Sequence, residues 1–457
     1  MPPDVGEPVI MAVTPDGAWR ETERPEPAMK LVLASYGGRG DVEPAVVVGR
    51  ELLRRGHDVQ MVVPPNLVSF AEAAGLETTA YGLDSQPILD LQRRYFTCYS
   101  RTPWKVKELS RMGRETEEFA IRCWGEMTTA LTPVAAGADL LLTGLIFEQP
   151  AANVAEYYDI PLATLHYFPV RAHGQLLPFV PSPISRTGMA VNDWMVWRGT
   201  RNGEDALRRD LGLPNSSAPT PRRIAERGSL EIQAYDEVYF PGLASEWAKW
   251  GDRRPFVGAL AMEMATDADD EVLSWIAEGT PPICFGFGSV PVDSPANTLA
   301  MISTACAQLG ERALVCSGST DFGGSPHSKH VKVVGVVNYA NVFPACRAVV
   351  HHGGAGTLAA CLRAGVPQLI LWTLPDQPFF AAQLKRLKVG AGRRFATTTA
   401  KSLVTDLRRI LDPRYRTRAR DLSTRITKPA ESATAAADLV ESFARLKRAG
   451  MRGSPPG

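Results

Sequence analysis

The stretch from Ala348 to Gly390 constrains the fold more than any other part of this sequence. It contains an apolar strand at Ala348–Val350, a turn at 351–357 with three glycines, a helix that ends near Gly365, and a second apolar strand at Gln368–Leu374. A strand, a helix and a strand in this order form a βαβ crossover, which requires a parallel sheet and has its ligand site at the carboxyl ends of the strands. The expected fold class is therefore α/β, with doubly wound sheets.

The turn has the composition of an anion-binding site. Its glycines allow backbone N–H groups to approach an anion closely, and the helix that follows adds the positive end of its dipole. His351 and His352 stand at the lip of the turn, where imidazoles suit a diphosphate that becomes a leaving group. Asp376 and Gln377 follow the next strand and are predicted to accept hydrogen bonds from sugar hydroxyls.

Three motifs follow one another here: HHGGAGT at 351–357, GVPQ at 365–368 and DQP at 376–378. Together they resemble the donor-binding signature of family 1 glycosyltransferases with the GT-B fold, and within that family the bacterial branch of antibiotic and sterol glycosyltransferases. Met29–Gly56 and Asp252–Leu260 extend the similarity, so that 29–447 as a whole resembles mycobacterial glycosyltransferases that decorate glycopeptidolipids. A glycine loop alone is weak evidence, whereas three motifs in the expected order are specific.

The resemblance implies two Rossmann-like, doubly wound domains that face a cleft, with a C-terminal helix that crosses back to the N-terminal domain. Breaks in the hydrophobic periodicity between Phe240 and Pro255 favour a linker there. The predicted division is a disordered tail at 1–28, an acceptor-binding domain at 29–240, a linker at 241–254, a nucleotide-sugar-binding domain at 255–428, a crossover helix at 429–447 and a disordered tail at 448–457. Residues 177–201 are expected to be irregular.

The turn at Tyr36–Asp41 distinguishes two classes of nucleotide-binding protein. A dinucleotide fingerprint is G-x-G-x-x-G, followed by an acidic residue at the end of the second strand. Counted from Gly38, the third glycine position is occupied by Glu43, and the second strand ends at Val63 without a carboxylate. The sequence therefore argues against a nicotinamide-dependent oxidoreductase.

Asp41 follows the first strand and begins a helix. A carboxylate at this position can simply cap the helix. In a sugar transferase it would face the cleft and accept the proton of the acceptor hydroxyl. By resemblance, GGRGD at 37–41 occupies the position where the bacterial branch keeps its candidate base, and Gly40 shapes the same lip. Capping and catalysis are compatible, and we predict Asp41 as the catalytic base.

The resemblance carries further residues over to the donor site. Ser289 follows a strand at Pro282–Gly288 and is expected to bind a phosphate oxygen, and Val337 lies in the loop expected to receive the nucleobase. The predicted donor-binding residues are Gly40, Ser289, Val337, His352, Gly353, Gly354, Ala355, Gly356, Thr357, Asp376 and Gln377. His166 and His173 follow a strand end in the first domain and are predicted to line the acceptor cleft. A buried histidine with satisfied hydrogen bonds is the alternative interpretation for both.

Composition excludes several other classes of function. A net charge of +1 with 22% charged residues gives no indication of a nucleic-acid partner. No apolar run approaches the ~20 residues of a membrane-spanning helix. The first 28 residues lack the basic start and the apolar core of a signal peptide. Seven cysteines without a CxxC pair indicate buried thiols in a reducing cytoplasm, and no spacing of His, Asp or Glu requires a metal.

The resemblance implies an inverting, metal-independent hexosyltransferase that needs no cofactor beyond its co-substrate, a dTDP- or UDP-sugar. The expected reaction transfers a 6-deoxyhexose (rhamnose or 6-deoxytalose) from a dTDP-sugar to a hydroxyl group of a lipopeptide of the glycopeptidolipid type. The alternative acceptor is a sterol, a polyketide or another hydrophobic molecule. The alternative of another class is a non-catalytic module that binds sugar nucleotides.

Arg408–Arg425 contains seven arginines and two aspartates. Such a segment is usually a solvated helix face. With a lipidic acceptor, it can also be a docking surface for anionic headgroups. The expected localisation is cytoplasmic, with peripheral association at the inner face of the plasma membrane.

Overall fold

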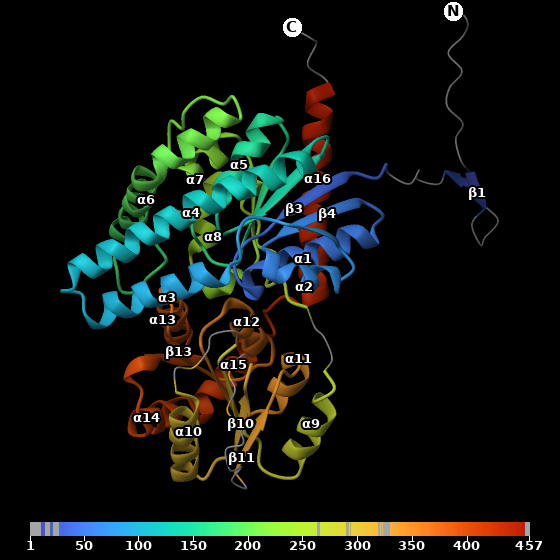
Figure 1. The fold of residues 1–457 in the computed structure, drawn as a ribbon. Helices are drawn as coiled ribbons and strands as arrows, with labels where there is room; N and C mark the ends of the chain where they lie inside the picture. The colour runs from blue at the N-terminus through green and yellow to red at the C-terminus, as the bar shows by residue number, and fades with distance from the viewer. Residues whose placement is uncertain are drawn as a thin grey trace, which may run out of the picture.

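The computed structural model describes residues 11–13, 19–21, 27–262, 266–288, 292, 294–318, 320, 322 and 330–452. Two six-stranded sheets, one in each half of the chain, form the framework, and helices surround both (Figure 1). The predicted α/β fold with two doubly wound domains is confirmed. Within the segment expected to be disordered, β1 (Met11–Val13) pairs with β2 (Trp19–Glu21) in an antiparallel ribbon.

The sheet of the first domain has the strand order β5-β4-β3-β6-β7-β8, and each neighbouring pair is parallel. Its strands are β3 (Lys30–Ala34), β4 (Asp58–Val63), β5 (Glu77–Ala80), β6 (Leu140–Gly144), β7 (Leu162–His166) and β8 (Leu230–Gln233). Its helices are α1 (Arg39–Arg54), α2 (Val68–Glu72), α3 (Gln86–Arg101), α4 (Val106–Ala135), α5 (Glu148–Tyr157), α6 (Ser182–Asp210) and α7 (Thr220–Glu226), with the 3-10 turn η1 at Pro65–Leu67.

The second sheet has the order β11-β10-β9-β12-β13-β14 and is also parallel throughout. Its strands are β9 (Ile283–Gly286), β10 (Ala313–Cys316), β11 (Val331–Val334), β12 (Ala348–His351), β13 (Gln368–Trp372) and β14 (Gly390–Arg394). The helices around it are α9 (Asp269–Ala277), α10 (Pro295–Leu309), α11 (Tyr339–Val342), α12 (Ala355–Arg363), α13 (Gln377–Leu387), α14 (Ala400–Ile410) and α15 (Pro413–Ser423), with the 3-10 turns η4 (Phe343–Ala345) and η5 (Phe395–Thr397).

Strand β3 shows why these strands are apolar throughout. Leu31 and Leu33 pack into the layer of α1 and the C-terminal helix, whereas Val32 and Ala34 pack against α4 and α5 on the opposite face. Side chains alternate between the two faces of a strand, and both faces are covered here. The order of the strands reverses direction between β3 and β6 and between β9 and β12. Ligands of open parallel sheets bind at such switch points.

The C-terminal helix α16 (Pro429–Arg452) crosses back to the first domain and runs beside α1 (Figure 1). His57 and Glu441 join the two parts through Nε2 and Oε1 at 2.8 Å, and Arg55 pairs with Asp438 at 2.6 Å. The predicted crossover is therefore confirmed, and the helix extends past 447 to Arg452.

Two further segments differ from the sequence-based expectation. The predicted linker contains α8 (Leu243–Trp247) and the 3-10 turn η3 (Ala248–Arg253), preceded by the 3-10 turn η2 (Glu237–Tyr239), and Trp247 is buried in a core shared with α13. The segment expected to be irregular carries most of α6, because the prolines before Ile184 start the helix instead of breaking it. Within the described ranges, no helix combines the length and apolar character needed to cross a membrane.

Candidate active site

Asp41 lies in the first turn of α1, directly beyond the carboxyl end of β3. The N–H of Gly38 donates to its Oδ2 at 2.6 Å, and the hydroxyl of Ser35 donates to its backbone carbonyl at 3.1 Å. Gly37 has φ +124°, and a Cβ at this residue would lie 2.4 Å from Oδ2 of Asp41. Only glycine combines this conformation with so close an approach. The local sequence therefore folds the carboxylate back over the turn.

Tyr167, just beyond β7, donates its hydroxyl to Oδ1 of Asp41. Burial raises the pKa of Asp41 above its ordinary value of 3.8, and the hydrogen bonds from Tyr167 and Gly38 oppose part of this rise. Each carboxylate oxygen has a second lone pair, so an acceptor hydroxyl can still donate to Asp41. The site thus contains a carboxylate with a raised pKa, which suits a general base.

Tyr167 was not among the residues predicted from sequence. Its position carried a usable signal, because successive side chains at a strand end point to opposite sides. His166 points into the interior, so the next side chain is expected on the other side, and the hydroxyl of Tyr167 indeed reaches Asp41 beyond the carboxyl end of β3.

His351 and His352 have different environments at the end of β12. Nδ1 of His351 accepts from the N–H of Gly353 at 3.1 Å, so Nε2 must carry the proton and donate to Oε1 of Gln368 at 3.0 Å. This residue is fully buried and holds the turn in shape. Burial lowers the pKa of His352 to about 4, and its Nδ1 is buried without a hydrogen bond in the described part of the chain. His352 is therefore a neutral imidazole beside the turn.

The turn after His352 presents the amino terminus of α12. Gly353 has φ +100°, and a Cβ there would lie 2.8 Å from Cγ2 of Ile370. Gly354 is the N-cap, and the first N–H that it accepts within the helix is that of Leu358 at 3.0 Å. The N–H groups of Ala355, Gly356 and Thr357 precede that bond and lie at the positive end of the helix dipole. This arrangement can bind an anion.

Asp376 and Gln377 begin α13 beyond the end of β13. Oε1 of Gln377 already accepts from the backbone N–H groups of Thr373 at 2.7 Å and Leu374 at 2.9 Å. The prediction that Gln377 accepts hydrogen bonds from a sugar is therefore wrong for this oxygen, and only the amide NH2 group can serve a ligand. Asp376 makes no side-chain cap bond to α13, which leaves its carboxylate free of that role.

The carboxylates of Asp41 and Asp376 come from different domains and influence each other. Burial is the larger reason that the pKa of Asp376 rises to about 6, and the negative charge of Asp41 raises it further. The charge of Asp376 also contributes to the raised pKa of Tyr167. The fold therefore brings the predicted base and the predicted sugar-binding acid to one interdomain site.

The remaining predicted donor residues lie around the same edges of the sheets. Gly40 is exposed in the first turn of α1, and Val337 is buried in the loop between β11 and α11. Asn338, the next residue, donates its backbone N–H to Oδ1 of Asp269 at 2.8 Å, which fixes this loop. Ser289 lies outside the described residues, so its role stays a prediction.

The two histidines predicted to line the acceptor cleft do not reach it. Both are fully buried. Nε2 of His166 lies 2.9 Å from Oε1 of Glu148, and its Nδ1 lies 3.4 Å from Nε2 of Gln233. His173 lies 3.2 Å from the carbonyl oxygen of Pro169 and accepts from the N–H of Gln175 at 3.0 Å. Because both rings are buried, neither can contact an acceptor, and the prediction that they line the acceptor cleft is wrong. The alternative interpretation, internal histidines with satisfied hydrogen bonds, is correct.

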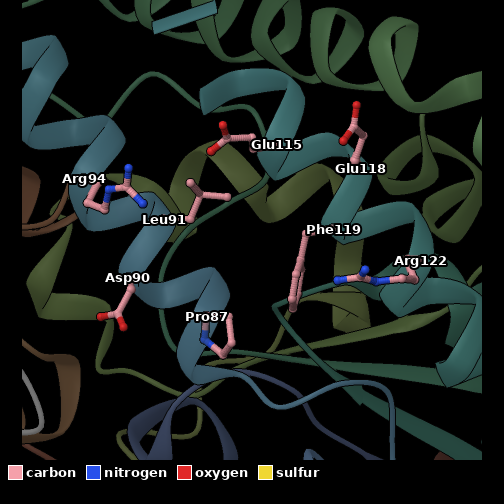
Figure 2. A pocket seen from close by; sticks show the side chains of 8 residues that line it. All are labelled: Pro87, Asp90, Leu91, Arg94, Glu115, Glu118, Phe119 and Arg122. Atoms are coloured by element: carbon pink, nitrogen blue, oxygen red, sulfur yellow. The ribbon is translucent and has the colours of Figure 1, made fainter. Parts of the chain in front are cut away.

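A cavity of about 450 Å3 lies elsewhere, between α3 and α4. Figure 2 shows Leu91 of α3 and Phe119 of α4 facing it from the two helices. Its lining is otherwise mostly charged: Asp90, Arg94, Glu115, Glu118 and Arg122, with Pro87 at one end. None of these residues was predicted to act in chemistry, and neither Asp41 nor Asp376 lines the cavity. The cavity is therefore not the reaction centre.

Substitution of Tyr167 by phenylalanine tests whether the hydroxyl of Tyr167 controls the pKa of Asp41. The hydroxyl of Tyr167 stabilises ionised Asp41 and lowers its pKa, so its loss should raise that pKa. Since the base must be ionised, the acidic limb of the pH profile of kcat/KM should move to higher pH, while the plateau above it is retained. The measurement is the pH–rate profile of both proteins. An unmoved acidic limb would show that Asp41 does not control it.

Comparison with known proteins gives independent evidence. Residues 31–143 match the model of the glycosyltransferase family 28 N-terminal domain. Residues 320–442 match the model of the C-terminal domain of proteins like erythromycin biosynthesis protein CIII. An uncharacterized glycosyltransferase of Mycobacterium tuberculosis is 59% identical over 423 residues, which cover 92% of this chain and 100% of the relative. A sterol 3-beta-glucosyltransferase of Arabidopsis thaliana is 26% identical over 451 residues, covering 95% of this chain and 70% of the relative.

Solved structures of the same fold are also similar. The glycosyltransferase of kitacinnamycin superposes with a TM-score of 0.67 at 19% identity, over 91% of this chain and 99% of that one. The glycosyltransferase VinC in complex with dTDP superposes with a TM-score of 0.61 at 17% identity, over 91% of this chain and 100% of that one. At such identities the likeness concerns the fold.

Proposed function

This chain belongs to the GT-B glycosyltransferases of family 1, and we propose that it transfers a 6-deoxyhexose from a dTDP-sugar to a hydroxyl group of a lipopeptide, with inversion at the anomeric carbon. Asp41 is the general base of this reaction. No metal ion and no cofactor other than the sugar nucleotide takes part.

The observation that carries the proposal is the meeting of two carboxylates and a helix amino terminus at one interdomain site. Asp41 supplies the base, and Asp376 lies close enough for the charge of Asp41 to affect its pKa. The N–H groups that begin α12 lie directly after His352. In the reacting complex the sugar lies between the acceptor and the diphosphate. Asp41 would therefore serve the acceptor, Asp376 the sugar, and the N–H groups of α12 the diphosphate.

The steps follow from these positions. Asp41 takes the proton from the acceptor hydroxyl while the oxygen attacks the anomeric carbon from the face opposite the diphosphate. The bond from that carbon to the diphosphate oxygen breaks, and the leaving group keeps the electron pair. The transition state resembles an oxocarbenium ion, as in inverting glycosidases. The free N–H groups of α12, its dipole and the neutral His352 stabilise the charge that develops on the diphosphate.

The proposed donor and the proposed acceptor are supported by different observations. For the donor, it comes from the VinC structure in complex with dTDP, which has the same fold, and from Asp376 as an acceptor for sugar hydroxyls. For the acceptor, it comes from the motif resemblance described above. The similarity to a sterol 3-beta-glucosyltransferase favours a sterol as the second candidate acceptor. A cytoplasmic enzyme at the inner face of the membrane would meet either class of lipid.

The test is turnover by the purified protein with a panel of dTDP- and UDP-sugars, offered with a lipopeptide core or with sterols. Release of nucleoside diphosphate and an inverted anomeric configuration, read by NMR of the product, are expected with dTDP-6-deoxyhexose and the lipopeptide. Transfer to sterols alone would replace the acceptor. Nucleotide binding without turnover on any acceptor would favour a sugar-nucleotide-binding module.

Substitution of Gly356 by alanine tests where the diphosphate binds. A Cβ at Gly356 meets nothing within 4 Å, and alanine is favoured over glycine in a helix by about 0.5–1 kcal/mol, so the variant should be at least as stable as the wild type. A methyl group beside the free N–H groups should nevertheless obstruct a diphosphate. We expect the Kd for dTDP, measured by calorimetry, to rise about tenfold, equivalent to about 1.4 kcal/mol.

The matched control is Gly113→Ala in α4, where a Cβ is equally unobstructed. Its affinity for dTDP should equal that of the wild type. An unchanged affinity in Gly356→Ala would place the diphosphate away from α12.

A further inference from the structure

Large apolar side chains are exposed on one part of the first domain. At the junction of α3 and α4, Trp104 is 74% exposed, and before and along α6, Phe179 and Trp194 are 76% and 52% exposed. Other large apolar residues that are exposed in these segments are Tyr95, Tyr99, Val106, Ile184, Val191, Met195 and Val196. Scattered exposed apolar residues are normal, whereas a concentration of them marks an interaction surface.

The two segments lie on the same side of the domain. Gly203 of α6 packs so closely on α4 that a Cβ would lie 2.6 Å from Ile121, and Gly125 of α4 approaches Leu207. The two helices therefore run in the same direction where they touch. The exposed first half of α6 extends toward the first half of α4 and its junction with α3 (Figure 1). Ile184, Val191 and Met195 recur on α6 at helical spacing, which forms one stripe.

The junction of α3 and α4 within this surface is basic, with Asp90 before it and Glu115, Glu117 and Glu118 after it. Between residues 93 and 114 the sequence has seven basic residues and one acidic residue, Glu108. Lys105 pairs with Glu108 at 3.1 Å. Arg94, Lys107 and Arg114 are exposed, and no ion pair joins them to another residue in the described part of the chain. Arg198 adds positive charge along α6, whereas Arg186 is paired with Glu246 at 2.7 Å. The surface therefore combines aromatic rings with an excess of unpaired cations.

We propose that the α3–α4 junction and the exposed half of α6 together dock on an anionic lipid bilayer. Basic residues near such a membrane are attracted by its negative surface potential, and tryptophan and tyrosine favour the interface between headgroups and acyl chains. An interfacial helix has this combination of an apolar stripe and flanking cations. The inference concerns where the protein meets the membrane, and its biological purpose rests on the lipidic acceptor proposed above.

The other basic segment, Arg408–Arg425, fits this role less well. Arg416 donates to the carbonyl oxygen of Cys346 at 2.8 Å, Arg418 donates to that of Leu387 at 3.3 Å, and Arg414 pairs with Asp412 at 2.7 Å. No large apolar side chain of this described segment is exposed. Three of its seven arginines are thus bound to carbonyl oxygens or to a carboxylate, and the described segment offers no large exposed apolar side chain that would insert among lipids.

The proposed surface is connected to the candidate active site through α3. At its beginning, Leu89 approaches Gly38 in the lip that holds Asp41, with 3.4 Å between Cδ1 and a Cβ added at that glycine. Further along, the ring of Phe96 lies 6.1 Å from that of Trp372 in the second domain. One helix therefore runs from the membrane-facing junction to the interdomain site.

Co-sedimentation of the full chain with vesicles tests the proposal. Vesicles of phosphatidylcholine with about one-third phosphatidylglycerol should bind the protein, vesicles of phosphatidylcholine alone should bind it weakly, and binding should fall at high salt. The double variant Trp104→Ala, Lys107→Glu should lose at least about tenfold in partition coefficient. The control Arg408→Glu, Arg409→Glu, on the other basic segment, removes twice as much positive charge and should still bind like the wild type.

Three outcomes would overturn the proposal: no binding to anionic vesicles, equal loss in both double variants, or no loss in the first. If sedimentation equilibrium instead showed a dimer that the first variant dissolves, the surface would be an interface between two copies. Affinity for dTDP should be unchanged in both variants, which checks folding. Because vesicle binding is read without turnover, failure here leaves the proposed reaction intact, and failure of the reaction leaves vesicle binding intact.

Discussion

Substitution of Asp41 by asparagine is expected to reduce kcat/KM by about 10²–10⁴-fold, the usual contribution of a general base. The amide has the shape of the carboxylate but cannot take a proton. Its oxygen can still accept from the N–H of Gly38, and the hydroxyl of Tyr167 can rotate to accept from the amide nitrogen. The contacts around residue 41 would therefore be kept while the base is lost.

In contrast to kcat/KM, the free energy of unfolding should rise or stay constant in Asp41→Asn. The pKa of Asp41 is raised in the folded protein, so the folded state binds a proton more readily than the unfolded state does. Ionised Asp41 thus lowers the free energy of unfolding once the pH exceeds its unfolded pKa, and asparagine removes this cost. An inactive variant with an undiminished denaturation midpoint is the expected result. The measurements are steady-state kinetics and denaturant unfolding.

Asp58→Asn is the matched control. Asp58 is exposed at the amino end of β4, at the opposite edge of the sheet from Asp41. The same chemical change there should leave both kcat/KM and stability unaltered. If Asp41→Asn retained full activity, Asp41 would be a structural residue of the turn, and the base would have to be sought elsewhere.

Much of the fold and part of the site were predictable from sequence because their determinants are local. In the glycine turn after β12, and likewise in the Gly37–Asp41 turn, the chain reverses, a helix begins and a polar side chain is placed, all within a few residues. Tyr167 escaped prediction because it meets Asp41 across 126 positions of the chain. No local pattern reports such a pairing.

Gln377 and α6 show two other limits. The position of Gln377 followed from the DQP motif, but its Oε1 is committed to the preceding turn, and a motif does not say which atom remains for a ligand. In the segment that carries most of α6, prolines and three aromatic residues suggested an irregular structure. The prolines stand at its beginning, and its later half is held by packing on α4, so tertiary contact outweighed local propensity.

The second large effect that we predict concerns the stability of the first domain, and it involves one of the two buried histidines. His166 belongs to a buried network in which Arg171 donates to both oxygens of Glu148 at 2.8 Å and also to Glu231. Arg254 pairs with Glu231 at 3.0 Å, and all of these side chains are buried. Burial alone would raise the pKa of Glu148, yet Arg171 and His166 lower it to about 2. The charges of this network therefore depend on one another.

Arg171→Met should destabilise the first domain by about 3–5 kcal/mol, because it leaves buried carboxylates without their main partner. Chemical unfolding, followed at the transition of the first domain, measures this loss. Arg222→Met is the control, since Arg222 and Glu226 form an exposed pair whose loss should cost below about 1 kcal/mol. Equal effects of the two substitutions would contradict the importance of the buried network.

The pH dependence of that loss separates electrostatics from packing. Because the pKa of Glu148 is depressed from 4.5 to about 2 in the folded protein, its ion pairs contribute fully above pH 4.5 and are lost as the pH falls toward 2. The deficit of Arg171→Met relative to the wild type should therefore shrink over this range. Adding Glu148→Gln to Arg171→Met should restore part of the stability at neutral pH, since one unpaired buried charge disappears. A deficit that is independent of pH and is not relieved by Glu148→Gln would mean that Arg171 acts through the packing of its side chain alone.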